Sequence, residues 1–133
     1  MYDFLKNISE NNGWGWVYGR SDYQNLENDM EAEKVYLFCD PIITDSKFSD
    51  AGNESLFYSG RFMMLLSSDI DEGYEDKYQH YIKPIINSQL KKLKDEFACS
   101  DYQITVFQTI EVININDVNG DGVLVNYNAS LID

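Results

Sequence analysis

The sequence predicts a single α+β domain in which one short and one long helix pack on a mainly antiparallel sheet of about four to five strands. Its 133 residues match the usual size of one domain. Apolar residues have helical spacing in two separate stretches, 2–11 and 74–98, and turn signals divide the extended runs between and after them. The predicted order is therefore α-β-β-β-α-β-β over residues 1–133, without an internal repeat.

The N-terminal region predicts a short helix and then a short strand. Phe4, Leu5 and Ile8 have helical spacing, and the Asn-Asn-Gly that follows favours a helix end, because Asn and Gly accept the left-handed conformation. The next run has a period of two, which places three aromatic side chains on one face: Trp14, Trp16 and Tyr18. Residues 21–33 are polar and acidic, which favours a solvated loop.

Two longer strands are expected next, at 34–43 and 56–67, and together they form a hairpin. In the first strand the apolar residues divide between two faces, Val35, Leu37 and Cys39 on one and Tyr36 and Phe38 on the other. Pro41 predicts that this strand leaves the sheet or lies on its edge there. The second strand is apolar on both faces, so we expect it at the centre of the sheet. Residues 44–55 read as a polar connection.

The long helix is predicted at about 74–98. Asp69 and Glu72 precede it with the spacing of a capping box, and Pro84 predicts a kink, because one backbone hydrogen bond is lost there. The residues expected to face the core lie at steps of three and four: Tyr78, Ile82, Ile85, Ile86, Leu93 and Phe97.

The C-terminal region predicts an antiparallel hairpin of 102–116 and 122–132. Asn-Gly and Asp-Gly pairs at 119–122 offer two alternative tight turns. Both turns place Ile110 and Val112 on the same face as Tyr127 and Ala129.

The composition is strongly acidic, with 23 Asp and Glu against 10 Lys and Arg and a formal net charge of -13. A basic footprint for phosphates is missing, which argues against specific nucleic-acid binding and against binding to anionic lipid. The acidity fits either simple solubility or a basic protein partner. The first residues do not resemble a signal peptide and no run is long enough to span a membrane, so we expect an intracellular or virion-associated protein.

A calcium-loop pattern occurs at 117–122, where Asp117, Asn119 and Asp121 have the D-x-N-x-D-G spacing that directs alternate oxygens to a hard cation. The twelfth position is Asn128 instead of the bidentate Glu, and a strand is predicted where a helix is needed. The pattern therefore favours a hairpin turn, and we expect no metal.

Candidate catalytic groups are few. His80 is the single histidine, and Cys39 and Cys99 lie in separate apolar segments, where we expect two buried free thiols. A zinc site needs more soft ligands than these, and no glycine-rich phosphate loop is present. We expect no enzyme activity, no cofactor and no small-molecule substrate.

Candidate contact residues come from three segments. The aromatic run around Trp14 and Trp16 fits either a binding platform or packing on the core as an edge strand, and the second reading is favoured. The acidic segment 21–33 and the connection 44–55 are the other candidates for partner contacts, and their residues are Glu27, Asp29, Asp45, Phe48 and Asp50.

The order of elements resembles the tail-terminator, tail-completion and neck-ring (head–tail connector) proteins of long-tailed bacteriophages. Three short sequence segments are also similar to segments of small phage structural proteins: Lys34–Pro41, Tyr81–Ile85 and Asp121–Tyr127. The resemblance spans nearly the whole chain. It rests on the order of elements and on these short sequence segments, without a catalytic signature.

The resemblance implies a virion protein, made in the host bacterial cytoplasm, that forms a homo-oligomeric ring of about six or twelve subunits and contacts neighbouring virion proteins. DNA passes through such a ring without specific binding, and a negative lumen suits that passage. The competing class is a small acidic inhibitor, a DNA mimic or immunity-type protein that binds a basic partner. An inhibitor of this kind stays a monomer or dimer, whereas a ring component forms a cyclic oligomer.

Overall fold

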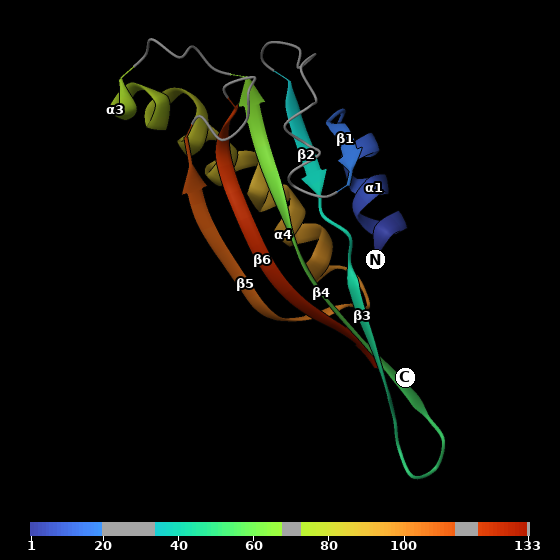
Figure 1. Ribbon diagram of the computed structural model, residues 1–133. Coiled ribbons are helices and arrows are strands. Elements are labelled where there is room, and N and C mark those ends of the chain that lie inside the picture. Colours follow the sequence, from blue (N-terminus) through green and yellow to red (C-terminus); the bar gives the residue numbers. More distant parts are fainter. Residues whose placement is uncertain (20–33, 68–72, 114–119, 133) are drawn as a thin grey trace.

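The computed structural model describes residues 1–19, 34–67, 73–113 and 120–132. They form an α+β fold in which helices lie against one face of a mixed, mostly antiparallel sheet of six strands (Figure 1). The strands are β1 (Gly15–Tyr18), β2 (Val35–Cys39), β3 (Ile43–Phe48), β4 (Glu54–Ser67), β5 (Gln103–Val112) and β6 (Gly120–Ile132). Their order is β1-β2-β4-β6-β5, and β3 pairs with β4 beside β2.

β4 is the central strand, as the sequence predicts. Its second half pairs with β2, its first half pairs with β3, and β6 pairs with it along its other side. All of these pairs are antiparallel. The parallel pair is β1 with β2, in which Gly15 faces Tyr36. A Cβ atom on Gly15 would lie 2.2 Å from the Tyr36 ring, so only glycine fits this close approach.

The expected polar connection at 44–55 is wrong, because most of it is strand. β2 ends at Cys39 and the chain leaves the sheet at Pro41, as expected, but it returns as β3 at Ile43. All six residues of β3 are exposed. A strand that buries neither face needs no apolar alternation, so its sequence looks like that of a loop. This strand makes the sheet one strand wider than predicted.

One continuous helical segment runs from Tyr74 to Ala98 and combines α3 (Tyr74–Lys77), η1 (Tyr78–Ile82), η2 (Ile85–Leu90) and α4 (Lys91–Ala98). The two η stretches are π-helical and lie on either side of Pro84. Because proline has no N–H and its ring crowds the carbonyl of the preceding turn, the hydrogen bonds around it shift to the wider pattern.

The π-helical stretches change which residues face the core. The buried residues of this helix are Lys77, Ile82, Ile85, Leu90, Leu93 and Phe97. Both five-residue steps in this series, from Lys77 to Ile82 and from Ile85 to Leu90, span a π-helical stretch. Tyr78 and Ile86, which the regular α-helical spacing predicted as core residues, are only half-buried. The predicted helix is therefore confirmed, and part of its predicted inner face is corrected.

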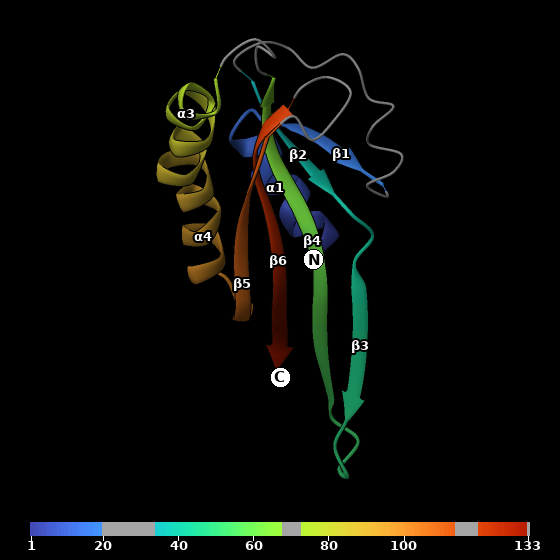
Figure 2. The ribbon, with the colours of Figure 1, turned by 60° about the vertical axis from the view of Figure 1, so that its left-hand side comes forward.

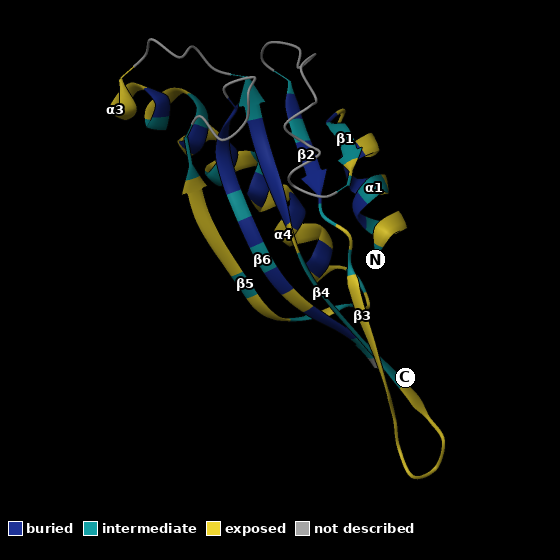
Figure 3. Cartoon of the chain, viewed as in Figure 1, coloured by how far each residue is buried: buried dark blue, intermediate teal, exposed yellow. Residues whose placement is uncertain are grey.

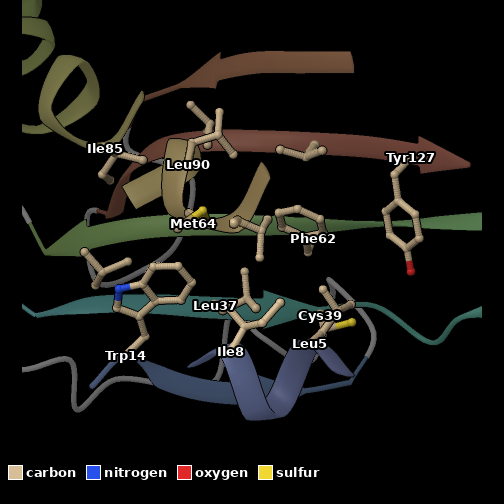
Figure 4. Packing of buried hydrophobic residues seen from close by; sticks show 14 of the residues in the cluster. Leu5, Ile8, Trp14, Leu37, Cys39, Phe62, Met64, Ile85, Leu90 and Tyr127 are labelled. Atoms are coloured by element: carbon tan, nitrogen blue, oxygen red, sulfur yellow. The ribbon is translucent and has the colours of Figure 1, made fainter. Parts of the chain in front are cut away.

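The main core lies between the sheet and both helices (Figure 4). α1 (Tyr2–Asn11) contributes Leu5 and Ile8, and the long helix covers the neighbouring part of the same face, here called the helix face. The strands contribute Leu37, Cys39, Phe62, Met64, Val123, Val125, Tyr127 and Ala129. A smaller cluster of Phe38, Met63 and Leu65 lies on the opposite face, here called the second face.

The predicted register of the C-terminal hairpin is wrong. Ile110 pairs with Leu124 and Val112 pairs with Gly122, so both lie on the second face, opposite to Tyr127 and Ala129. The Asp-Gly pair at 121–122 lies inside β6 and forms no turn. β5 ends at Val112 and β6 begins at Gly120, so the two strands are farther apart in the sequence than a two-residue turn would allow. The observed register differs from the predicted one by an odd number of residues. An odd shift places each β5 side chain on the opposite face of the sheet.

Candidate functional site

The β3–β4 hairpin extends beyond the rest of the molecule (Figures 1 and 2). Its turn is closed by Ser49 and Asn53, whose backbone N–H and C=O groups are joined at 2.9 Å, and Gly52 adopts the left-handed conformation with φ of 85°. β6 accompanies β4 only from Ser55 onward. Among the described residues, the part of the hairpin that β6 does not flank is therefore the turn and the Phe48–Glu54 pair.

β3 is exposed along its whole length, whereas β4 beside it is exposed at Glu54 and half-buried from Ser55 to Gly60 (Figure 3). Phe48 stands next to the turn with 67% of its surface exposed. On the other side of the hairpin, the ammonium group of Lys47 lies 4.7 Å from the centre of the Phe57 ring. A large apolar side chain at the end of a projecting hairpin is costly in water and is typical of a contact with another surface.

The β5 strand forms the opposite edge of the sheet. Among the described residues it pairs with β6 alone. Seven of its ten residues are exposed, including Val106 and Ile110, which are 44% and 42% exposed. Such an edge presents a row of backbone N–H and C=O groups to solvent.

The second face carries a shallow hollow of about 500 Å³ between these two edges. The Arg61 guanidinium and the Asp40 carboxylate form an ion pair at its border. The Asn126 amide donates to the Gln108 side-chain oxygen at 3.2 Å. The other residues at this hollow are uncharged: Pro41, Ile43, Ser59, Gly60, Val106, Tyr127 and Asn128. This surface can form hydrogen bonds but offers little net charge.

A second hollow, of about 630 Å³, lies at the start of the long helix and is acidic. It is lined by Tyr74, Glu75, Asp76, Tyr78, Gln79 and Glu111. Beside it, the Lys77 ammonium donates to the Asp121 carboxylate at 3.0 Å, and both side chains are fully buried. This ion pair ties the first turn of the helix to the beginning of β6.

The candidate nucleophiles and the histidine lie on different parts of the fold: Cys39 in β2, and His80 and Cys99 toward opposite ends of the long helical segment. Burial raises the pKa of the Cys39 thiol to about 12, which keeps it protonated and unreactive at neutral pH. His80 is exposed on the long helix beside the Tyr81 ring. No group of three His, Cys, Asp or Glu side chains within the described ranges is close enough to hold a metal ion. In the same ranges, no helix is long and apolar enough to cross a membrane.

The predicted contact residues separate into three groups. Asp45, Phe48 and Asp50 lie exposed on the β3–β4 hairpin. Trp14 is buried, its indole N–H donating to the Gln89 side-chain oxygen at 2.9 Å, and Trp16 is half-buried against the Tyr2 ring. Packing on the core is thus found for Trp14 and in part for Trp16, whereas Tyr18 at the end of β1 is 46% exposed. Glu27 and Asp29 lie outside the described residues.

Other predicted residues have mixed outcomes. Asp117 and Asn119 of the calcium-loop pattern lie outside the described residues, whereas Asp121 lies in β6 and binds Lys77. Cys39 is a buried free thiol, as expected, but Cys99 is exposed, because it follows the last turn of the long helix. The expectation of two buried thiols is therefore wrong for Cys99.

Sequence reasoning missed the Lys77–Asp121 pair and the open edge at β5. Lys77 gave no signal, because a lysine in the first turn of a helix is usually exposed. The sequence does contain a signal for the open edge, because β5 is poor in charge. It has one charged residue, Glu111, among ten, in a chain where 25% of residues are charged. Comparison with protein-family models, with curated proteins and with solved structures gave no significant match.

Proposed function

We propose that this chain is a non-enzymatic structural subunit that assembles with copies of itself into a closed ring, of about six or twelve subunits, at the neck or tail end of a phage virion. The observation that carries the proposal is the projecting β3–β4 hairpin with Phe48 exposed near its end. The turn and the Phe48–Glu54 pair lie beyond the last pair of β4 with β6, so a neighbouring surface that covers Phe48 would remove its apolar side chain from water.

Charge supports the same function. A net charge of -13 keeps free subunits soluble and repels the phosphate backbone of DNA. The hollow on the second face is lined mainly by uncharged residues and one ion pair, so it offers no strong site to a passing nucleic acid. The N-terminal helix, the central antiparallel pairs and the long helix also agree with the order of elements on which the resemblance to neck and tail-completion proteins rests.

The acidic hollow at the start of the long helix supports a second candidate function, an inhibitor of a basic protein. The two functions differ in self-association. The ring component forms a closed oligomer of defined size, whereas the inhibitor stays small and binds a basic partner tightly.

The test is light scattering coupled to size exclusion over a concentration series, with electron microscopy of any large species. The matched variants are Phe48→Ser and Tyr74→Ser, since both side chains are highly exposed, at 67% and 72%, on different parts of the molecule. Burial of Phe48 contributes about 2 kcal/mol, so its loss weakens each contact roughly thirtyfold.

We expect Phe48→Ser to shift assembly to higher concentration and Tyr74→Ser to leave it unchanged. A wild-type chain that remains monomeric at every concentration, alone and with its neighbouring virion proteins, would refute the ring. Tight binding of that monomer to a basic protein, lost when Glu75 and Asp76 are neutralised, would favour the inhibitor.

A further inference from the structure

We infer that the β5 edge of one copy pairs with the β3 edge of a second copy, so that the sheet continues from subunit to subunit. This interface rests on the proposed function and specifies which surfaces form the ring.

The β5 edge lacks the features that keep exposed edges from pairing. Edge strands of soluble proteins are usually short, or carry Lys, Pro or inward-pointing charges. β5 has ten residues, no Pro and no Lys, and is rich in β-branched residues. Its one irregularity is the register shift between Ile104 and Val106, which leaves Val106–Val112 as a regular strand of seven residues. A free edge of this kind is a template for another strand.

The β3 edge matches it in length, charge and direction. β3 has six residues, and Asp45 and Lys47 cancel in charge. Because β3, β4, β6 and β5 pair in series and each pair is antiparallel, β3 and β5 run in opposite directions. A second copy that continues the same sheet keeps the strand directions of the first, so its β5 meets β3 in antiparallel orientation.

The faces of the sheet select one register. Ile43, Asp45 and Lys47 lie on the second face, in the rows of Ser59 and Phe57, and the same face of β5 carries Val106, Gln108, Ile110 and Val112. A continuous sheet requires these sets to lie opposite each other. If all six residues of β3 pair within Val106–Val112, the faces match only when Ile43 lies opposite Val112.

This register places compatible side chains together. Phe48 lies opposite Phe107, and Ser46 lies opposite Thr109, both on the helix face. Aromatic and hydroxyl pairs of this kind stabilise antiparallel strands. Phe107 is half-buried under the ammonium group of Lys94, at 5.2 Å from the ring centre, so one side of the ring is already ordered. The contact would cover Phe48, the exposed side chain on which the proposed function depends.

The same register is compatible with a closed ring. Within one copy Ile43 shares a row with Val106, through Ser59 and Asn128, whereas across the interface it lies opposite Val112. This offset is about 20 Å at 3.3 Å per residue, over four strands that together span about 19 Å. Because the offset along the strands about equals the width of the four strands, the sheet closes when its strands tilt by roughly 45° from the ring axis. This tilt is at the upper end of those found in closed barrels.

The test is disulfide cross-linking in a Cys99→Ser background, because Cys99 is exposed and would otherwise react. Ser46→Cys and Thr109→Cys are introduced together and separately, both at exposed positions that tolerate small side chains. The matched control pairs Ser46→Cys with Glu111→Cys, which lies on the same face but is displaced by two residues, about 7 Å. Mild oxidation at a concentration where light scattering detects oligomers is followed by denaturing gels without reductant.

We expect the Ser46–Thr109 pair to give a ladder of covalent oligomers on the order of tenfold stronger than the control pair, since opposite Cβ atoms lie about 5 Å apart. An equal mixture of the two single variants should give dimers alone. Oligomers without this cross-link would overturn the interface while leaving ring assembly intact, and self-linked Thr109→Cys would reveal a two-fold β5–β5 contact instead. A chain that never oligomerises, alone or with its neighbouring virion proteins, would overturn the proposed function itself.

Discussion

The buried Lys77–Asp121 ion pair allows a quantitative prediction of how much stability is lost when either residue is replaced. The two side chains are fully buried and their charged atoms lie 3.0 Å apart. At an effective dielectric constant of about 20, the Coulomb attraction at that distance is roughly 5 kcal/mol, and it offsets the desolvation of both ions. Removing either partner leaves one buried charge without this compensation. We therefore expect Lys77→Met and Asp121→Leu each to lower the free energy of unfolding by about 3–5 kcal/mol.

The double variant separates the value of the pair from the cost of an orphaned charge. Lys77→Met with Asp121→Leu removes both charges and keeps apolar volume at each position, so it should be far more stable than the sum of the single losses predicts. The assay is urea unfolding followed by circular dichroism, with the four free energies combined in a double-mutant cycle. Single losses below about 1 kcal/mol, or a double variant that shows simple additivity, would contradict a closed buried ion pair.

Three further predictions concern single residues. In the native protein a thiol reagent at neutral pH should modify Cys99 but not Cys39, and denaturant should release the second thiol. The pKa of Cys39 is raised by burial from 9.0 to about 12, so its stabilising contribution is complete below pH 9 and is lost as pH rises from 9 to 12. Alkaline titration of the unfolding free energy should show this decline, and Cys39→Ala should reduce the slope by up to about 1.4 kcal/mol per pH unit. A Cβ atom at Gly122 would lie 1.9 Å from the Met64 carbonyl oxygen, so Gly122→Ala should cost about 3 kcal/mol or more, whereas Gly19→Ala, where a Cβ meets no atom within 4 Å, should be nearly neutral in thermal unfolding.

The parts of the fold that follow from sequence are those that bury an apolar face. β2, β4 and the long helix carry alternating or helically spaced apolar residues, and the structure has them where the spacing indicates. β3 escaped prediction because it buries nothing. The inner face of the helix was partly mistaken, because the π-helical stretches beside Pro84 insert steps of five that bring Leu90 inward.

The candidate site was only partly predictable for a similar reason. Phe48, Asp45 and Asp50 are candidate contact residues because they lie in a segment that the sequence predicts as a polar connection, and the resemblance implies that such connections reach a neighbouring subunit. The proposed pairing of β5 with a second copy depends on which face of β5 carries Ile110. The number of residues between β5 and β6 decides that face, and the composition of the strands does not. An odd difference in that separation reverses the face of every residue in the strand.

The central position of β6 has a consequence for synthesis. This strand lies between β4 and β5, yet it is separated from the end of β4 by residues 68–119. At about 5–20 residues per second, a ribosome needs roughly 3–10 s to add that stretch, and throughout this time β4 has no β6 to pair with. Its apolar residues, including Met63, Met64 and Leu65, then lie beside an unpaired edge that other nascent chains can bind. The speed of translation between the two strands should therefore affect how much of the protein reaches its native state, and a slow stretch of codons there would lower the yield of soluble subunits.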